Sequence, residues 1–125
     1  MEFAILYDRP MRIVCAALGL GPGLSGVTVS SNSVTVRMGW AFRTDIPRSE
    51  ITSVAPATKR TISIGVHGWG GRFLVNGSAS QLVTISTSDR VSCRFLGMRR
   101  PMRALTVSVE DLDGLLGAIQ PNVTM

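Results

Sequence analysis

The sequence of 125 residues has little of the chemistry on which most enzymes and metalloproteins depend. It contains one histidine, two cysteines and eight acidic residues, and these groups do not have the spacing of a metal site or of paired catalytic carboxylates. Its glycines match no dinucleotide-binding or phosphate-binding motif. The scarcity of such groups argues against an enzyme, and the sequence calls for no metal and no cofactor.

Long apolar runs are also missing. The longest, Ile13 to Leu20, has eight residues, whereas a membrane-spanning helix needs about 20. Gly21 to Gly23 then interrupts it. Cys15 and Cys93 each lie on an apolar stripe, so we expect buried free thiols in a reduced cytoplasm. This expectation includes a peripheral position at the inner face of the membrane.

What the sequence does have is arginine. Twelve of its thirteen basic residues are arginine, and the net charge is +5 with a pI near 10.6. A basic surface supplies salt-sensitive affinity for polyanions. Hydrophobic residues make up 45% of the chain, which indicates a folded protein, and the length is that of one domain.

Alternation of apolar and polar residues predicts a mainly β structure. The strongest stripe runs from Val34 through Trp40 to Phe42 and predicts one long strand with a buried Trp40. Val27 to Ser30 should pair with it through the Ser31–Asn32 turn. Further stripes are Ile62/Ile64/Val66, Phe73/Val75, Val83/Ile85, Val91/Cys93/Phe95 and Leu105/Val107/Val109, with hairpin turns expected at Asn76–Ser78 and Ser88–Asp89.

Two helices are expected to flank the strands. Leu112, Leu115, Leu116 and Ile119 have helical spacing, with Ser108 as the expected cap and Glu110, Asp111 and Asp113 near the positive helix start. A shorter helix is predicted around Met11, Val14, Cys15 and Leu18, beginning near Pro10 and ending at Gly19.

This order of elements resembles bacterial pleckstrin-homology-like (PH-like) domains, and in particular small actinobacterial proteins of that type. The likeness rests on a first hairpin, the segment Ile46 to Ile51, further strands, and the acidic start of the final helix within Leu105 to Ile119. It implies a partly open antiparallel β-barrel of about seven to eight strands with a C-terminal capping helix. Residues 1–125 would then be a single domain, in which 27–120 form the barrel and helix. Residues 1–26 would be an N-terminal strand–helix extension and connector.

The main candidate binding segment is the stretch from Met98 to Arg103. It places Arg99, Arg100 and Arg103 beside Met98 and Met102 in an expected exposed loop. Arginines attract anionic phosphates, and methionines adapt to apolar surfaces. Lys59 and Arg60 are expected nearby. The alternative is a solvated basic loop whose methionines pack on the sheet.

A second candidate is the glycine-rich segment 65–71, expected to be a loop, with His67 and Trp69. We therefore expect a non-catalytic interaction module that binds a protein partner or an anionic surface. One alternative is a small-ligand carrier whose cavity is gated by residues 65–71. Another is nucleic-acid binding, which would require exposed aromatic rings such as Trp40 and Phe42.

Overall fold

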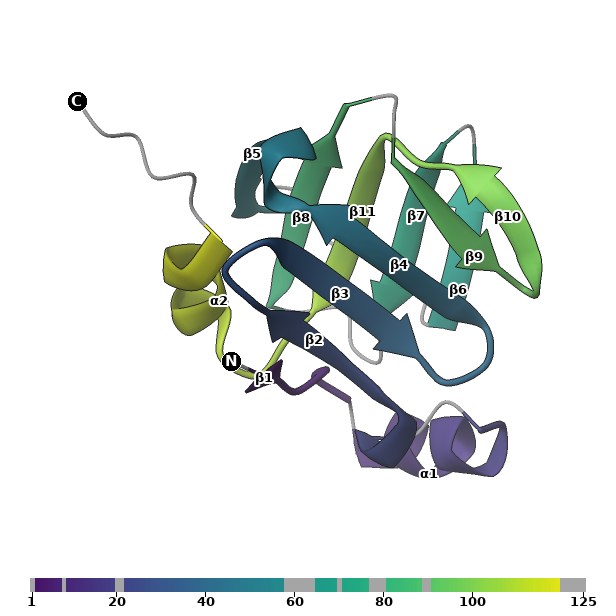
Figure 1. Cartoon of the computed structure of the whole chain (residues 1–125). Coiled ribbons are helices and arrows are strands. Elements are labelled where there is room, and N and C mark those ends of the chain that lie inside the picture. Colours follow the sequence, from purple (N-terminus) through teal and green to yellow (C-terminus); the bar gives the residue numbers. More distant parts are fainter. Residues whose placement is uncertain are drawn as a thin grey trace.

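Two β-sheets face each other and enclose most of the apolar side chains (Figure 1). The computed structural model describes residues 2–7, 9–19, 22–57, 65–69, 71–76, 81–88 and 91–119. The elements in these ranges are β1 (Glu2–Phe3), α1 (Arg9–Ala17), η1 (Pro22–Leu24), β2 (Ser25–Val29), β3 (Ser33–Met38), β4 (Phe42–Pro47), η2 (Arg48–Glu50), β5 (Ile51–Pro56), β6 (Gly65–Trp69), β7 (Arg72–Asn76), β8 (Leu82–Thr87), β9 (Ser92–Phe95), β10 (Met98–Pro101), β11 (Ala104–Ser108) and α2 (Leu112–Ile119). The predicted mainly β, α+β class is confirmed. The described strands form two sheets rather than a closed barrel, and they outnumber the seven to eight expected.

The first sheet is antiparallel throughout, in the order β1-β2-β3-β4-β9-β10. Its β2–β3 hairpin confirms the predicted turn, with Val29 opposite Val34. Ser30 and Ser33 close this turn: the Ser30 N–H donates to the Ser33 carbonyl at 2.9 Å, and the Ser33 N–H donates to Ser30 Oγ at 3.1 Å. The serine-rich segment therefore forms the reversal that its composition predicted.

The stripe from Val34 to Phe42 forms a hairpin instead of one long strand, and the prediction of a buried Trp40 is wrong. β3 ends at Met38, which pairs with Phe42 at the start of β4. Gly39 has a φ of +54°, a conformation open to glycine, and allows the reversal. Trp40 lies in the turn and is 64% exposed. Because the intervening turn spans residues 39–41, the stripe keeps its parity across it, and alternation alone does not reveal the break.

The second sheet is mixed, in the order β5-β8-β11-β7-β6, because β7 and β11 run parallel. The expectation of purely antiparallel pairing is therefore wrong for this sheet. β11 lies between β7 and β8, and β8 and β9 belong to different sheets. The hairpins expected around 76–78 and 88–89 are thus also wrong: turn residues signal a change of direction but do not specify the neighbouring strand.

Three phenylalanines connect the two sheets across the core. Phe42 and Phe95 belong to the first sheet, and Phe73 belongs to the second. The ring centroids of Phe42 and Phe73 lie 5.7 Å apart, and those of Phe73 and Phe95 lie 5.2 Å apart. Fully buried side chains around them include Val34, Val36, Met38, Ile46, Ile85, Met102 and Leu105. This packing holds the first sheet with one dry face and one face toward solvent.

Helix α2 covers one edge of this core, as its apolar spacing predicted. Leu115 and Ile119 are buried, Leu112 and Leu116 pack partly buried against the core, and the helix contacts β5 and β8. The predicted cap is wrong. Ser108 belongs to β11, and its hydroxyl donates to the Leu6 carbonyl at 2.9 Å.

Asp111 caps α2 instead, because its Oδ1 accepts the Gly114 N–H at 3.0 Å. Several polar residues precede the helix, and which of them becomes the cap depends on where β11 ends.

The N-terminal residues pack on the same core. Phe3 pairs with Val27, and Ile5 forms a bridge with Val109 near the end of the sequence's last strand. Phe3, Ile5 and Cys15 all belong to the buried cluster that the two sheets enclose. The strand–helix extension is thus continuous with the packing of the rest of the chain.

Helix α1 is confirmed where the sequence predicted it, and Gly19 ends it with a φ of +78°. Only part of its apolar side is buried. Cys15 points into the core, whereas Ile13, Val14 and Leu18 are exposed. Among the described helices none has the length and apolar character needed to cross a bilayer.

The contrast between Phe42 and Trp40 gives a test of the fold. Phe42 is 1% exposed, so Phe42→Ala should lower the free energy of unfolding by about 3–5 kcal/mol. Trp40→Ala should lower it by about 1 kcal/mol, the value of one exposed hydrogen bond. Urea unfolding followed by circular dichroism measures both. Equal losses in the two variants would contradict the turn position of Trp40.

Candidate functional site

Four arginines form a row across four neighbouring strands of the first sheet. Arg37 of β3 pairs with Arg43 of β4, Arg43 pairs with Arg94 of β9, and Arg94 pairs with Arg99 of β10. Adjacent strands lie about 4.8 Å apart, so the row extends about 14 Å across the sheet. We call these four residues the arginine row.

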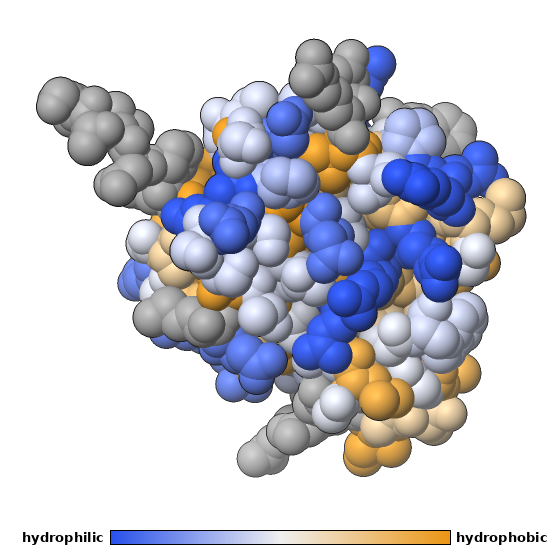
Figure 2. All heavy atoms as spheres, viewed as in Figure 1, coloured by the Kyte–Doolittle hydropathy of each residue, from blue (hydrophilic) through white to orange (hydrophobic). Residues whose placement is uncertain are grey.

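The row lies on the solvent face because its members alternate with core residues. Val36 and Met38 flank Arg37 and are buried, while Arg43, Arg94 and Arg99 are exposed. The guanidinium of Arg37 extends toward β2, where it lies 3.9 Å from the position that a Cβ atom on Gly26 would occupy. In Figure 2 a hydrophilic band runs diagonally across this face, over β4, β9 and β10.

Like charges placed directly opposite each other destabilise a sheet. For exposed charges at the spacing of neighbouring strands, the repulsion is about 1 kcal/mol per pair in water and falls with salt. Among the described residues one ion pair offsets it: Arg43 Nε lies 3.5 Å from Asp45 Oδ2. Thr35 holds Asp45 from the neighbouring strand by donating to its Oδ1 at 2.6 Å. Asp45 thus offsets one of the four positive charges, and in the described part of the chain the other three arginines of the row form no ion pair.

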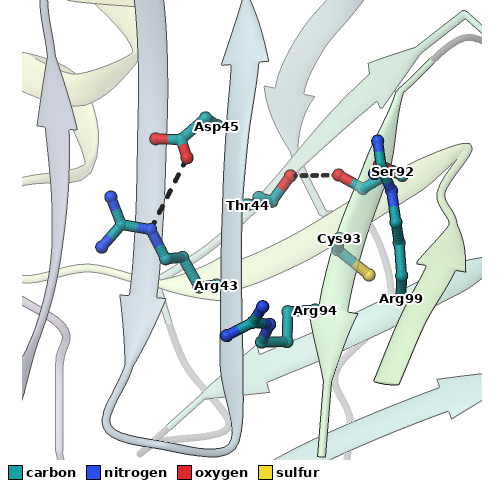
Figure 3. A pocket seen from close by; sticks show the side chains of 7 residues that line it. All are labelled: Arg43, Thr44, Asp45, Ser92, Cys93, Arg94 and Arg99. Carbon is teal, nitrogen blue, oxygen red and sulfur yellow. Dashed lines mark hydrogen bonds and ion pairs between the residues drawn. The ribbon is translucent and has the colours of Figure 1, made fainter. Parts of the chain in front are cut away.

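A polar groove of about 440 Å³ opens along the row. It is lined by Arg43, Thr44, Asp45, Ser92, Cys93, Arg94 and Arg99, whose side chains are drawn in Figure 3. Thr44 Oγ1 donates to the Ser92 carbonyl at 2.9 Å, and Arg99 Nε donates to Ser92 Oγ at 3.1 Å. These bonds fix β9 between β4 and β10. The groove is wide enough for a phosphate or carboxylate group, with guanidinium donors from three strands.

A second, more apolar groove of about 390 Å³ adjoins the first and shares Arg43 with it. Its lining comes from Gly19, Leu24, Arg37, Gly39, Trp40 and Arg43. The indole N–H of Trp40 donates to the Leu18 carbonyl at 2.7 Å, which holds the ring beside the end of α1. An anionic site and an apolar site are therefore adjacent on the same surface.

The thiols do not supply a reactive group. Burial raises the pKa of Cys93 to about 11, and burial also raises the pKa of Cys15. Both thiols are thus protonated at neutral pH, which makes them poor nucleophiles. Within the described ranges, histidine, cysteine and carboxylate groups do not gather in threes as a metal site would require.

The predicted binding segment from Met98 to Arg103 is not a loop. Residues 98–101 form β10, which turns back on β9 through Leu96 and Gly97, both with positive φ. Met102 is 0% exposed and belongs to the core, because the chain passes there from the first sheet into the second. For this residue the alternative of a methionine packed on the sheet is confirmed. Met98 is exposed.

The three arginines of this segment do not share a face. Arg99 joins the arginine row, and Arg100, the next residue of the strand, points to the other face of β10. Arg103 lies against the Gly71 turn, where its backbone N–H donates to the Gly71 carbonyl at 2.7 Å.

Residues 65–69 of the glycine-rich segment, which include His67 and Trp69, form β6 and pair with β7, so the expectation of a loop is wrong for these residues. The small-ligand carrier with a cavity gated by residues 65–71 stays an alternative prediction. The side chains of His67 and Trp69 lie outside the described part of the structure, as do Lys59 and Arg60.

The sequence interpretation missed Arg37, Arg43 and Arg94. Each occupies a polar position of a predicted strand, and such positions usually carry solvated charges. The missing signal was the register. Arg37 and Arg43 become neighbours only when the chain reverses between β3 and β4, and Arg94, which is distant in sequence, joins them only when β9 pairs with β4.

The sequence matches no family model, and neither a curated protein nor a solved structure with significant similarity was found. The site is therefore interpreted from its own geometry.

The buried thiols predict slow modification. With a pKa of about 11 instead of 9.0, the thiolate fraction of Cys93 at pH 8 falls about a hundredfold. A small disulfide reagent should modify native Cys93 at least about a hundredfold more slowly than the same cysteine in denaturant. Mass spectrometry of the native and unfolded protein identifies the modified residue. Rapid native modification of Cys93 would instead indicate an accessible thiol in the polar groove.

Proposed function

We propose that this protein is a non-catalytic interaction module that binds an anionic surface through the arginine row. The observation that carries the proposal is the pairing of Arg37, Arg43, Arg94 and Arg99 across four adjacent strands. Repulsion within the row destabilises the fold, so selection for stability alone would replace these arginines with uncharged residues. Binding of a polyanion relieves this repulsion and uses all four guanidinium groups together.

The geometry favours an extended anionic partner over a single small anion. The row spans about 14 Å, which exceeds the size of one phosphate group. Guanidinium groups form forked hydrogen bonds with phosphate and carboxylate oxygens. A surface that presents several such groups would therefore contact more of the row than an isolated ion does.

Membership of the PH-like type stays a proposal. It is supported by two facing sheets and by a C-terminal helix packed at β5 and β8. The parallel pairing of β7 with β11 departs from the antiparallel arrangement that the resemblance implies. The functional proposal rests on the arginine row and does not depend on this relationship.

A second candidate is binding of single-stranded nucleic acid, favoured by the exposure of Trp40 beside Arg37 and Arg43. An exposed ring next to basic groups is the combination that single-strand binders use. Phe42, the other ring that this function would have used, is buried. Among the described side chains Trp40 is the one strongly exposed ring, and one ring offers much less stacking than the platforms of such proteins.

Removal of the row should weaken polyanion binding without unfolding the protein. Each arginine at an anionic surface contributes about 1 kcal/mol, so replacing Arg43, Arg94 and Arg99 by glutamine should weaken binding about a hundredfold. Inorganic polyphosphate, titrated calorimetrically in low and near-physiological salt, is the probe. Glutamine removes like-charge repulsion but also the exposed Arg43–Asp45 ion pair and the Arg99–Ser92 hydrogen bond, so the variant should melt close to the wild-type temperature.

The matched control replaces Arg72, Arg100 and Arg103 by glutamine. These residues are exposed and lie outside the row, and the control has the same net charge as the row variant. We expect it to retain most of the affinity. Equal weakening in the two triple variants would show that net charge alone attracts the probe, and would overturn the proposed site.

A further inference from the structure

The large hydrophobic residues that are exposed gather at one end of the first sheet. Within the described residues they are Ile13, Val14, Leu18, Leu24, Trp40, Leu96 and Met98. They come from α1 and the residue that follows it, η1, the β3–β4 turn, the β9–β10 turn and the first residue of β10. We call this set the apolar end. Figure 2 shows hydrophobic atoms gathered beside the lower end of the hydrophilic band, over α1.

Backbone contacts join these segments into one surface. The Gly39 N–H donates to the Leu24 carbonyl at 3.1 Å, which ties the β3–β4 turn to η1. The Leu96 N–H donates to the Ala41 carbonyl at 2.8 Å, which ties the β9–β10 turn to the same place. Exposed apolar side chains gathered on joined segments of a folded protein commonly mark an interaction site.

The indole N–H of Trp40 already has a hydrogen-bond partner within the protein, so the ring can enter an apolar environment at low cost. A buried indole N–H without a partner is costly, but here the Leu18 carbonyl already accepts that hydrogen bond at 2.7 Å. The bond also satisfies a carbonyl at the C-terminal end of α1, where helical partners run out. The ring can therefore leave water without leaving a donor unpaired.

The ring's position is set by Gly19. A Cβ atom at Gly19 would lie 3.0 Å from Trp40 Cδ1, so only glycine lets the helix end approach the indole this closely.

The arginine row lies directly behind the apolar end. Arg37 and Arg43 are each three residues from Trp40, on either side of the β3–β4 turn, and line the same groove as its ring. Arg94 and Arg99 lie closer still to Leu96 and Met98 in the sequence. Apolar groups of peripheral proteins enter a bilayer by about 5–10 Å, which would place the row at the depth of the lipid phosphates.

Other occupants fit this surface less well. Two copies of the chain would bring two arginine rows together, and each chain carries a net charge of +5. A nucleic acid would use the row and the Trp40 ring, but the aliphatic side chains around the ring offer nothing to its bases. An anionic bilayer matches both the charge and the apolar part.

We propose that the anionic surface is a lipid bilayer containing anionic lipids, into which the apolar end inserts while the arginine row binds the phosphates. This inference rests on the proposed polyanion binding and names its partner. Trp40 then marks the level at which the protein enters the interface, as tryptophans at membrane–water boundaries do.

Vesicle binding tests the inference. Sedimentation compares vesicles of phosphatidylcholine with vesicles that also contain phosphatidylserine. Wild type should bind the anionic vesicles and bind the zwitterionic ones much more weakly. Trp40 emission, obtained as the difference between wild type and Trp40→Phe, should shift to shorter wavelength on binding. In the double variant Trp40→Gln with Met98→Gln, vesicle binding should weaken by about tenfold or more.

The matched control keeps both positions apolar, as Trp40→Phe with Met98→Leu, and should bind vesicles nearly as wild type does. The glutamine variant keeps the arginine row and should bind polyphosphate as wild type does. Polyphosphate binding without vesicle binding would overturn the bilayer inference and leave the proposed function standing. The bilayer inference would also be wrong if an oligothymidylate quenched Trp40 emission while anionic vesicles did not shift that emission. If wild type bound neither polyphosphate nor anionic vesicles, the proposed function itself would be wrong.

Discussion

The pairing of Phe42 with Phe95 determines both faces of the first sheet. These rings pack on Phe73 of the second sheet, so the register between β4 and β9 is fixed by the core. A slip by one residue would turn every side chain of a strand to the opposite face and place arginines between the sheets. Since Arg43 and Arg94 follow from the same register, the arrangement of the arginine row is a direct consequence of aromatic packing on the other side.

This dependence explains how the protein holds four like charges together. Their repulsion acts at an exposed face, where water and salt reduce it. The opposing face buries Met38, Phe42 and Val36, each of which stabilises the fold by about 1.5–3 kcal/mol through loss of apolar contact with water. The core contribution exceeds the repulsion, so the strands keep their register. The strain of the site is thus electrostatic and lies where a ligand can relieve it.

The sequence predicted the mainly β class, both helices, the β2–β3 hairpin and the inward face of most strands, because these depend on local periodicity. It did not predict that β11 inserts between β7 and β8, since strand order depends on contacts between distant segments. The position of Trp40 was missed for a related reason: a turn of odd length leaves the alternation intact. The sequence predicted Arg99 of the arginine row and Met98 of the apolar end. The partners of Arg99 required the register. Arg100 was grouped with Arg99 because the segment was expected to be a loop, whereas neighbours in a strand point to opposite faces.

The arginine row and the apolar end lie on different kinds of backbone structure. The arginine row lies within strands, where pairing on both sides fixes the spacing of Arg43 and Arg94. The side chains of the apolar end belong mostly to turns and to the end of α1, where they are exposed. Trp40 is positioned there by its hydrogen bond to the Leu18 carbonyl and by the space that Gly19 leaves. Rigid strands suit a row that must match the separation of fixed charges. Turns suit side chains that have to adjust to an irregular apolar partner, because a change of rotamer there disturbs no core contact. The fold therefore places the arginine row on strands and the apolar end mostly on turns, although the two are only a few residues apart.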